Sequence, residues 1–487
     1  MKTNVILAAA LLTSVAAFSL VQGADATASD PNLLNQLTGV APPLPVALPG
    51  SGPSPTISTL PNIFNVRDYG AKGDHTTKDT AAFQQALDAC TSFGVIHGAG
   101  VVLVPKGNYL LGSVVLGPNT TIRFEPDAYI TESPDSADYP IIKARFEGEM
   151  VDCHRSLFYA SHADHIGIIG PGNILAASAL CYPSNRNPRS PCIFEPVDCF
   201  DVLVESFSVQ YDEPAQGQKS DIGFIHPNFC TKFTARNLYL RSLLENGDGL
   251  DLDSCADVVI EGCDISTGSD AIALKSGRGL EAARMGRPTT DVTIRNCKLH
   301  SAIFAALALG SETSGGIRNV DIHDCTLFGM ENAILIKSRQ GRGGFIENIS
   351  GEDLVIESSP TFLCLNLVSA GDPATEPVPG PLYDWTLVRN LSFENVQVKN
   401  VQTLIGASGG QAAPPLISPD APVNGFTLTN LTGTCQHGIY LDNVLNAHFS
   451  KILVKGFSGN LLNLTNVTGT GLENPVAAST SLNTPVK

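Results

Sequence analysis

The densest cluster of side chains that could do chemistry lies between residues 245 and 279, in the stretch ENGDGLDLDSCADVVIEGCDISTGSDAIALKSGRG. Asp248 and Asp270 are 22 residues apart there, and each follows a glycine-containing turn. Two facing carboxylates can hydrolyse a glycosidic bond, because one assists departure of the leaving group while the other activates water. Aspartates also cap turns routinely, and that structural role is the alternative for Asp248 and Asp270 and still more for Asp251 and Asp253.

The elements that must position these aspartates are short, β-branched runs that recur about every 20 to 35 residues. Examples are VVLV, TTIRF, DVLVESFSV, KFTARNLYL, DVVIEGCDI and DVTIRNCKL. A run this short cannot bury its own apolar face, so it must stack on its neighbours. The joining segments are too long for hairpins, which argues against a sandwich, and propeller blades would repeat more evenly. The pattern predicts an all-β, right-handed parallel β-helix.

A helix is expected only near the start of this region, over Asp79 to Cys90. Phe83, Ala86, Leu87 and Cys90 follow helical spacing there, and such a helix can cap the open end of the solenoid. Residues one coil apart should stack at the strand spacing of roughly 4.8 Å. Polar side chains of successive coils can therefore line a groove that suits a polymeric substrate, and Asp248 and Asp270 are about one coil apart.

The composition and the N-terminal residues indicate where the protein acts and which partners are disfavoured. The 487 residues carry 47 acidic and 30 basic side chains, for a net charge of −17, which argues against a nucleic-acid or anionic-membrane partner. Lys2, the apolar run from Val5 to Val21 and the small residues to Ala26 indicate a signal peptide, with a membrane anchor as the alternative. A Pro/Ala-rich linker follows over residues 27–61. We expect a secreted or periplasmic monomer with the β-helix at 62–470 and a tail at 471–487.

The twelve cysteines fit an oxidising compartment, but export alone does not make them disulfides. Cys199, Cys255, Cys297 and Cys325 stand in similar repeated contexts. A small apolar side chain at one point of each repeat indicates a buried stack more simply than a set of bridges.

Three segments resemble glycoside hydrolase family 28, the polygalacturonase group of pectin-degrading β-helix enzymes. They are FNVRDYGAKGDHTTKDTAAFQQALDAC, RNCKLHSAIFAALALGSETSGGIRNV and ILIKSRQGRGGFIENI. The resemblance is strongest from about Asn65 to Ile349. It implies a pectin-lyase-like solenoid that hydrolyses O-glycosyl bonds of pectin with inversion and requires neither a cofactor nor a metal.

The catalytic residues of the family carry over only in part. The family's Asn-Thr-Asp stands here as Asn246-Gly247-Asp248, and its Gly-Asp-Asp stands as Gly268-Ser269-Asp270. The resemblance implies that Asp248 and Asp270 position the attacking water, and that the aspartate replaced by Ser269 is the general acid. A serine hydroxyl cannot serve as a general acid near neutral pH.

The substrate-binding positions are also changed. Phe304 or Ala305 occupies the place of the family's histidine, and Leu335-Ile336-Lys337 stands for its Arg-Ile-Lys. Leu335 cannot pair with a uronate carboxylate as an arginine fork does. We expect the retained Lys275 and Lys337, together with Asn246 and Asp251, to bind the sugar.

Two functions remain open at this point. In the first, the chain is a glycosidase for a less acidic or differently linked pectic sugar, with Glu312 or His300 supplying the missing proton. In the second, the groove is a non-catalytic, glycan-binding or structural β-helix, which the three substitutions favour. A calcium-dependent lyase is disfavoured, because nothing in the spacing gathers the aspartates around a cation.

Overall fold

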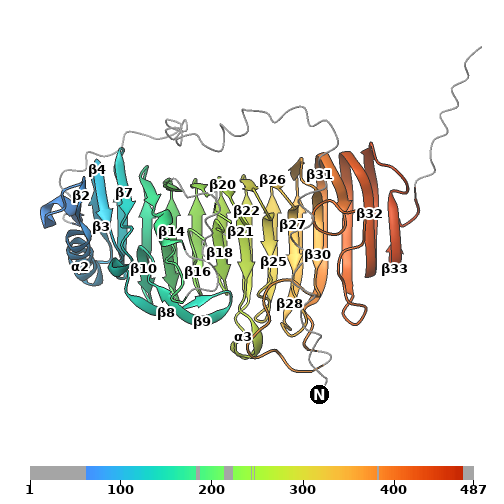
Figure 1. Cartoon of the computed structure of the whole chain (residues 1–487), viewed down its shortest axis with the longest axis horizontal. Coiled ribbons are helices and arrows are strands. Elements are labelled where there is room, and N and C mark those ends of the chain that lie inside the picture. The colour runs from blue at the N-terminus through green and yellow to red at the C-terminus, as the bar shows by residue number, and fades with distance from the viewer. Residues whose placement is uncertain are drawn as a thin grey trace, which may run out of the picture. The chain divides into compact units, whose positions relative to one another are not determined.

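The computed structural model describes residues 62–181, 187–212, 223–242, 244–245, 247–380 and 383–474. These residues form a parallel β-helix whose coils each contribute strands to three faces (Figure 1). The predicted signal peptide (1–26) and linker (27–61), and most of the predicted tail (471–487), lie outside the described residues. Within the described part of the chain, no helix has the length and apolar character needed to cross a bilayer.

The first face stacks ten strands in parallel register before the long C-terminal strands continue it. They are β1 (Ile63–Asn65), β3 (Gly100–Val104), β6 (Thr120–Phe124), β11 (Ile166–Ile169), β14 (Phe200–Glu205), β16 (Thr231–Arg236), β19 (Ala256–Glu261), β22 (Thr289–Arg295), β25 (Ile317–His323) and β28 (Phe345–Glu352).

The second face follows in each coil and is equally regular. Its strands are β2 (Asp74–Lys78), β4 (Gly107–Leu111), β7 (Ala128–Glu132), β12 (Asn173–Ala176), β15 (Ser208–Tyr211), β17 (Tyr239–Arg241), β20 (Asp264–Thr267), β23 (Lys298–Ser301), β26 (Thr326–Gly329) and β29 (Val355–Glu357).

The third face is the one that carries the chemistry. Its strands are β5 (Val114–Leu116), β10 (Phe158–Ser161), β13 (Phe194–Val197), β18 (Leu250–Asp253), β21 (Ile272–Lys275), β24 (Ala305–Leu309), β27 (Asn332–Lys337) and β30 (Thr361–Asn366). All three faces then continue into β31 (Leu387–Ile405), β32 (Val423–Lys455) and β33 (Leu462–Thr470).

The turn from the first face to the second explains the Asn, Asp and Gly residues of the repeat. Asn237, Asn296 and Asp324 occupy it in separate coils with φ of 52°, 54° and 54°, and Gly262 takes the same place with φ of 63°. This left-handed region is costly for most L-residues but accessible to Asn, Asp and Gly. The position of Asn, Asp or Gly in each repeat therefore determines where the coil turns from the first face to the second.

The predicted capping helix is present and longer than expected. Helix α2 spans Thr80–His97 and buries Phe83, Ala86, Leu87 and Cys90. It covers the first coils at one end of the solenoid (Figure 1). The apolar spacing indicated where the helix begins but not its last two turns, where Val95 and Ile96 are exposed.

Two elements leave the solenoid. An antiparallel hairpin, β8 (Ile141–Phe146) and β9 (Glu149–His154), projects before β10. Helix α3 (Gly279–Met285) lies between β21 and β22. Neither was expected from the sequence.

The twelve cysteines are all free and buried, including the four whose repeat context indicated a buried stack. The sequence suggested one equivalent position, but the structure has two. Cys199, Cys230 and Cys255 stack just before the first face, and a second stack follows it. The second stack is Cys263, Cys297 and Cys325. Thiols fill these narrow corners of the core as small apolar groups.

We predict that the folded protein reacts slowly with a thiol reagent, because all twelve cysteines are buried and burial raises the pKa of Cys90 to about 11. After unfolding in denaturant without reductant, twelve thiols should titrate. A smaller number after unfolding would mean that some of the stacked cysteines form disulfides in the native protein.

Candidate active site

The structure brings Asp248 and Asp270 together at the entrance to the third face. Asp248 lies just before β18 and Asp270 just before β21, so the two occupy equivalent turns of neighbouring coils. The backbone N–H of Asp270 donates to Oδ1 of Asp248 over 3.0 Å. The coil length, rather than a local motif, therefore makes these two carboxylates neighbours.

Each of these carboxylates is paired with a lysine from the third face. Lys275 Nζ lies 3.3 Å from Asp248 Oδ2 and 3.0 Å from Asp251 Oδ1. Lys337 Nζ lies 2.6 Å from Asp270 Oδ2, and the backbone N–H of Ala305 donates to Asp270 Oδ1 over 3.2 Å. The retained lysines thus hold the retained aspartates in place.

The environment separates the pKa values of the two aspartates. Burial disfavours the charged form of Asp248, yet Lys275 and the hydroxyl of Ser269 together lower its pKa below the ordinary value. For Asp270 burial prevails: it raises the pKa, against the opposing charge of Lys337 and with a further contribution from Asp248. Asp248 is therefore the stronger carboxylic acid of the pair and holds its negative charge to lower pH.

Asp251 lies on β18 and faces the same lysine as Asp248. Its side chain is buried, and burial together with the charge of Asp248 raises its pKa well above the ordinary value. Asn246, the fourth predicted substrate-binding residue beside Lys275 and Lys337, lies outside the described residues. Among the described residues, no group of His, Cys, Asp and Glu side chains converges as it would around a metal ion.

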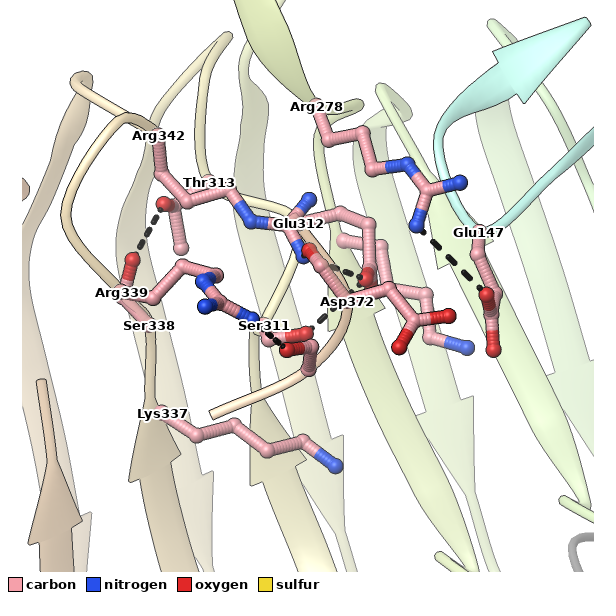
Figure 2. Close-up of polar contacts among 12 residues, drawn as sticks. Glu147, Arg278, Ser311, Glu312, Thr313, Lys337, Ser338, Arg339, Arg342 and Asp372 are labelled. Atoms are coloured by element: carbon pink, nitrogen blue, oxygen red, sulfur yellow. Dashed lines mark hydrogen bonds and ion pairs between the residues drawn. The ribbon is translucent and has the colours of Figure 1, made fainter. Parts of the chain in front are cut away.

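The two predicted replacement acids lie in different places. Glu312 follows β24 near the lysines, accepts from Ser311 Oγ over 2.9 Å and lies 3.5 Å from Arg342 Nη2 (Figure 2). His300 lies on the second face, where its Nδ1 is 2.9 Å from Ser266 Oγ and its ring packs on Phe328.

The pKa shifts of Glu312 and His300 argue against either residue as the proton donor. Burial would raise the pKa of Glu312, but Lys275, Arg342 and Lys337 outweigh it and lower the pKa to about 2. A carboxylate that is ionised at neutral pH has no proton to donate. Burial also lowers the pKa of His300, which favours its neutral form.

The substituted positions lie in the coil of Asp270 and in the two coils that follow it. Ser269 is buried and contacts Asp248. Phe304 lies in the turn before β24 and is partly exposed. Leu335 packs from β27 against an apolar cluster of Ala273, Ala305 and Ala308. These three alanines are fully buried, so the partly exposed Leu335 side chain stands where the resemblance implies an arginine with its positive charge.

Three further charged or titratable side chains lie at the site, and two of them, Arg145 and His226, were not singled out from the sequence. Arg342 is fully buried beside Glu312, and Arg145 pairs with Asp253 over 3.0 Å between Nε and Oδ2. Burial lowers the pKa of His226 to about 3. Only the coil register could have revealed His226, because it places this residue in one row with Asp251.

Two family models match segments of this chain. The family model "Glycosyl hydrolases family 28" matches residues 218–361, and "Rhamnogalacturonase A/epimerase, pectate lyase-like" matches residues 63–156. A "Probable polygalacturonase" of Vitis vinifera is 26% identical over 77% of this chain and 75% of its own length.

Two solved structures share the fold. The exopolygalacturonase of Thermotoga maritima has a TM-score of 0.63 and 22% identity over 85% of this chain and 93% of its own. The family 28 exopolygalacturonase of Yersinia enterocolitica has a TM-score of 0.67 and 19% identity over 85% of this chain and 78% of its own. The predicted right-handed parallel β-helix is thereby confirmed.

We predict that Glu312→Gln destabilises the protein at neutral pH and much less in acid. A carboxylate whose pKa is lowered from 4.5 to about 2 on folding stabilises the native state above the unfolded value. That contribution, about 3 kcal/mol, is lost as the pH falls from about 4.5 to about 2. Urea unfolding of both proteins at about pH 7 and about pH 3 measures the difference.

The matched control is Glu357→Gln, because Glu357 and its partner Lys399 are both 49% exposed. An exposed pair contributes about 0–1 kcal/mol, so this variant should change little at either pH. Equal losses for Glu312→Gln at both pH values would show that its effect is steric rather than electrostatic.

Proposed function

On the premise that this chain is a polygalacturonase-like protein related to glycoside hydrolase family 28, we propose that it hydrolyses O-glycosyl bonds in a pectin-type polysaccharide or oligosaccharide. The names of its relatives support a hydrolase and do not favour the non-catalytic alternative. The observation that carries the proposal is the contact of Asp248 with Asp270 across adjacent coils, each with its own lysine.

In the proposed reaction, Asp248 and Asp270 position a water molecule and Asp248 takes its proton. The water oxygen forms a bond to the anomeric carbon as the glycosidic C–O bond breaks on the opposite side, which inverts the configuration. Asp248 suits the base because the charge of Lys275 keeps it ionised. Asp270 must also be ionised to orient the water, so turnover should rise with pH through its raised pKa.

This site lacks a side chain suited to protonate the leaving group. The family's acid position is Ser269, and Glu312 is held ionised by three cations. The departing oxygen must then take its proton from solvent, which makes bond cleavage depend on how stable the leaving group is as an anion. We infer a slow hydrolase whose rate is set by leaving-group departure.

The substrate unit beside Asp270 is a less acidic sugar than galacturonate in this proposal. Leu335, which is partly exposed above three fully buried alanines, offers an apolar contact, and Lys337 is already engaged by Asp270. A carboxylate placed there would lose hydration without gaining a free cation. We further propose that the protein is exported and acts as a monomer, supported by the Lys2 and Val5–Val21 pattern for export.

We predict that Asp270→Asn abolishes turnover, by about two to four orders of magnitude, and preserves glycan binding. The measurement is reducing-end release from polygalacturonate, rhamnogalacturonan, xylogalacturonan and short galacturonides, with binding followed by calorimetry. Asp321→Asn, at a 53% exposed carboxylate on β25, is the control and should keep full activity. Unchanged turnover in Asp270→Asn would remove this residue from the mechanism.

We predict that Ser269→Asp raises turnover on natural glycans by about two orders of magnitude, because it places a carboxyl group beside Asp248. That neighbouring charge raises the pKa of the new carboxyl and keeps it protonated. An aryl glycoside, whose phenolate departs without protonation, should show little gain. Ser269→Asn is the matched control. A gain of equal size on both substrates would contradict the leaving-group limitation.

A further inference from the structure

A second hollow lies at the opposite edge of the third face from the catalytic aspartates. Asp248 and Asp270 stand just before the third-face strands β18 and β21, whereas this hollow lies past the end of the third face, where β25 and β28 of the first face begin. Its volume is about 430 Å³. The described residues that line it include none of the catalytic aspartates and lysines. The hollow is therefore distinct from the catalytic site.

Four segments enclose this hollow, which we call the corner cavity. They are residues 283–288 of α3 and the turn after it, residues 314–318 at the start of β25, residues 344–345 at the start of β28, and Val378 with Tyr383 from a later loop. Helix α3 projects from the solenoid at these coils (Figure 1). Because the walls come from distant parts of the chain, the cavity exists only in the folded protein.

Two glycines leave the floor of the corner cavity as bare main chain. A Cβ at Gly315 would lie 2.5 Å from the carbonyl oxygen of Arg287, which is too close for any side chain. Gly316 has φ of 93°, and a Cβ there would overlap the ring of Phe345. The ring of Phe345 therefore lies directly over the backbone of Gly316.

Two aromatic rings border the cavity. Phe345 is partly exposed, and Tyr383 is 74% exposed. The main chain holds the loop of Tyr383 in place, because the backbone N–H groups of Gly341 and Gly343 both donate to the carbonyl of Asp384, over 2.7 and 3.1 Å. The exposed Tyr383 ring is thus carried on a fixed support. Such rings offer a flat apolar surface, with a polar hydroxyl at the edge of the tyrosine.

Arg318 supplies the positive charge of the corner cavity. Its Nε donates to Thr290 Oγ1 over 3.3 Å, and its guanidinium carbon lies 6.0 Å from the centre of the Phe345 ring. Among the described residues, no carboxylate forms an ion pair with Arg318. Its neighbour in the next coil, Glu347, pairs with Arg389 over 2.7 Å instead. The N–H donors of the Arg318 fork are therefore available to a carboxylate from outside the protein.

The corner cavity differs in charge from the catalytic site. Lys275 and Lys337 are each neutralised by aspartates of the protein. By contrast, the described lining of the corner cavity contains no acidic residue. Asp384, next to Tyr383, accepts from Gln340 Nε2 over 2.8 Å. An anionic group that enters the cavity therefore meets an arginine without a carboxylate partner and no carboxylate in the lining.

We propose that the corner cavity binds a uronate unit of a pectic glycan, outside the catalytic site. The Arg318 guanidinium pairs with the sugar carboxylate, and the C–H groups of the sugar ring lie against Phe345 and Tyr383. An apolar hollow with one well-placed polar group is typical of small-ligand sites. The choice of a pectic glycan rests on the proposed function. The acidic units of the glycan are bound here, while the catalytic site takes a less acidic unit.

The test compares the binding of trigalacturonate and of its methyl ester, in which every carboxylate is neutral, by calorimetry on the full chain. We expect trigalacturonate to bind and the ester to bind about tenfold more weakly, because a hydrogen bond to a charged group contributes about that factor. Equal affinity for the two compounds, or no binding of trigalacturonate, would overturn the inference.

Two variants change the charge of the cavity in opposite ways. Arg318→Gln removes the cation, and Ala283→Glu adds a carboxylate at a partly exposed position of α3. Both should weaken trigalacturonate binding about tenfold or more, and Arg318→Gln should bind the acid and the ester alike. Ala283→Gln is the control for size. Arg295→Gln, at a 40% exposed arginine paired with Glu261, is the control for charge, and both controls should bind like the wild type.

The same measurement on Asp270→Asn locates the bound glycan. Its affinity for trigalacturonate should equal that of the wild type, because Asp270 does not line the cavity. A loss of affinity in Asp270→Asn, or unchanged affinity in folded Arg318→Gln, would overturn the inference. Hydrolysis is followed separately. Turnover of a pectic glycan without binding at the cavity would leave the proposed function standing, whereas binding at the cavity without any turnover would count against the proposed function alone.

Discussion

The stacking of one coil on the next is the interaction on which the whole molecule depends. Each coil contributes strands of about three to eight residues, whose apolar side chains are buried only because the neighbouring coils cover them. The same stacking sets the register, and the register decides which polar residues become neighbours. Asp248 contacts Asp270 because one coil separates them, and Lys337 reaches Asp270 from two coils further along the chain.

Burial makes the charges of the site interdependent. Asp251, Asp270, Glu312 and Arg342 are all at most 5% exposed, so removal of any partner leaves a charge with neither water nor a counter-ion. This explains a pattern in the substitutions. Lys275 and Lys337 each neutralise a buried aspartate and are retained. Ser269, Phe304 and Leu335 stand at positions that neutralise no charge in the described structure, so a change at these positions leaves the ion pairs of the site intact.

The features that follow from the periodicity of the sequence were predicted, and those that depend on contacts between distant segments were missed. The solenoid, the capping helix and the Asp248–Asp270 pair all follow from apolar spacing and coil length. The β8–β9 hairpin lacks an Asn-Gly or Asp-Gly turn, since Glu147-Gly148 joins its strands. Its partner Arg278 is 129 residues from Glu149 in sequence. Nothing local to either segment indicates that they meet.

The net charge and the missing acid bear on one question, which is how an acidic protein handles an acidic polymer. A chain of net charge −17 repels a long polyanion. The cations at the site, Lys275, Lys337, Arg278 and Arg342, are already balanced by aspartates and glutamates of the protein. Leu335 adds no charge at the position where the resemblance implies an arginine. In the proposed function, a sugar of low charge beside the partly exposed Leu335 therefore suits this site better than polygalacturonate.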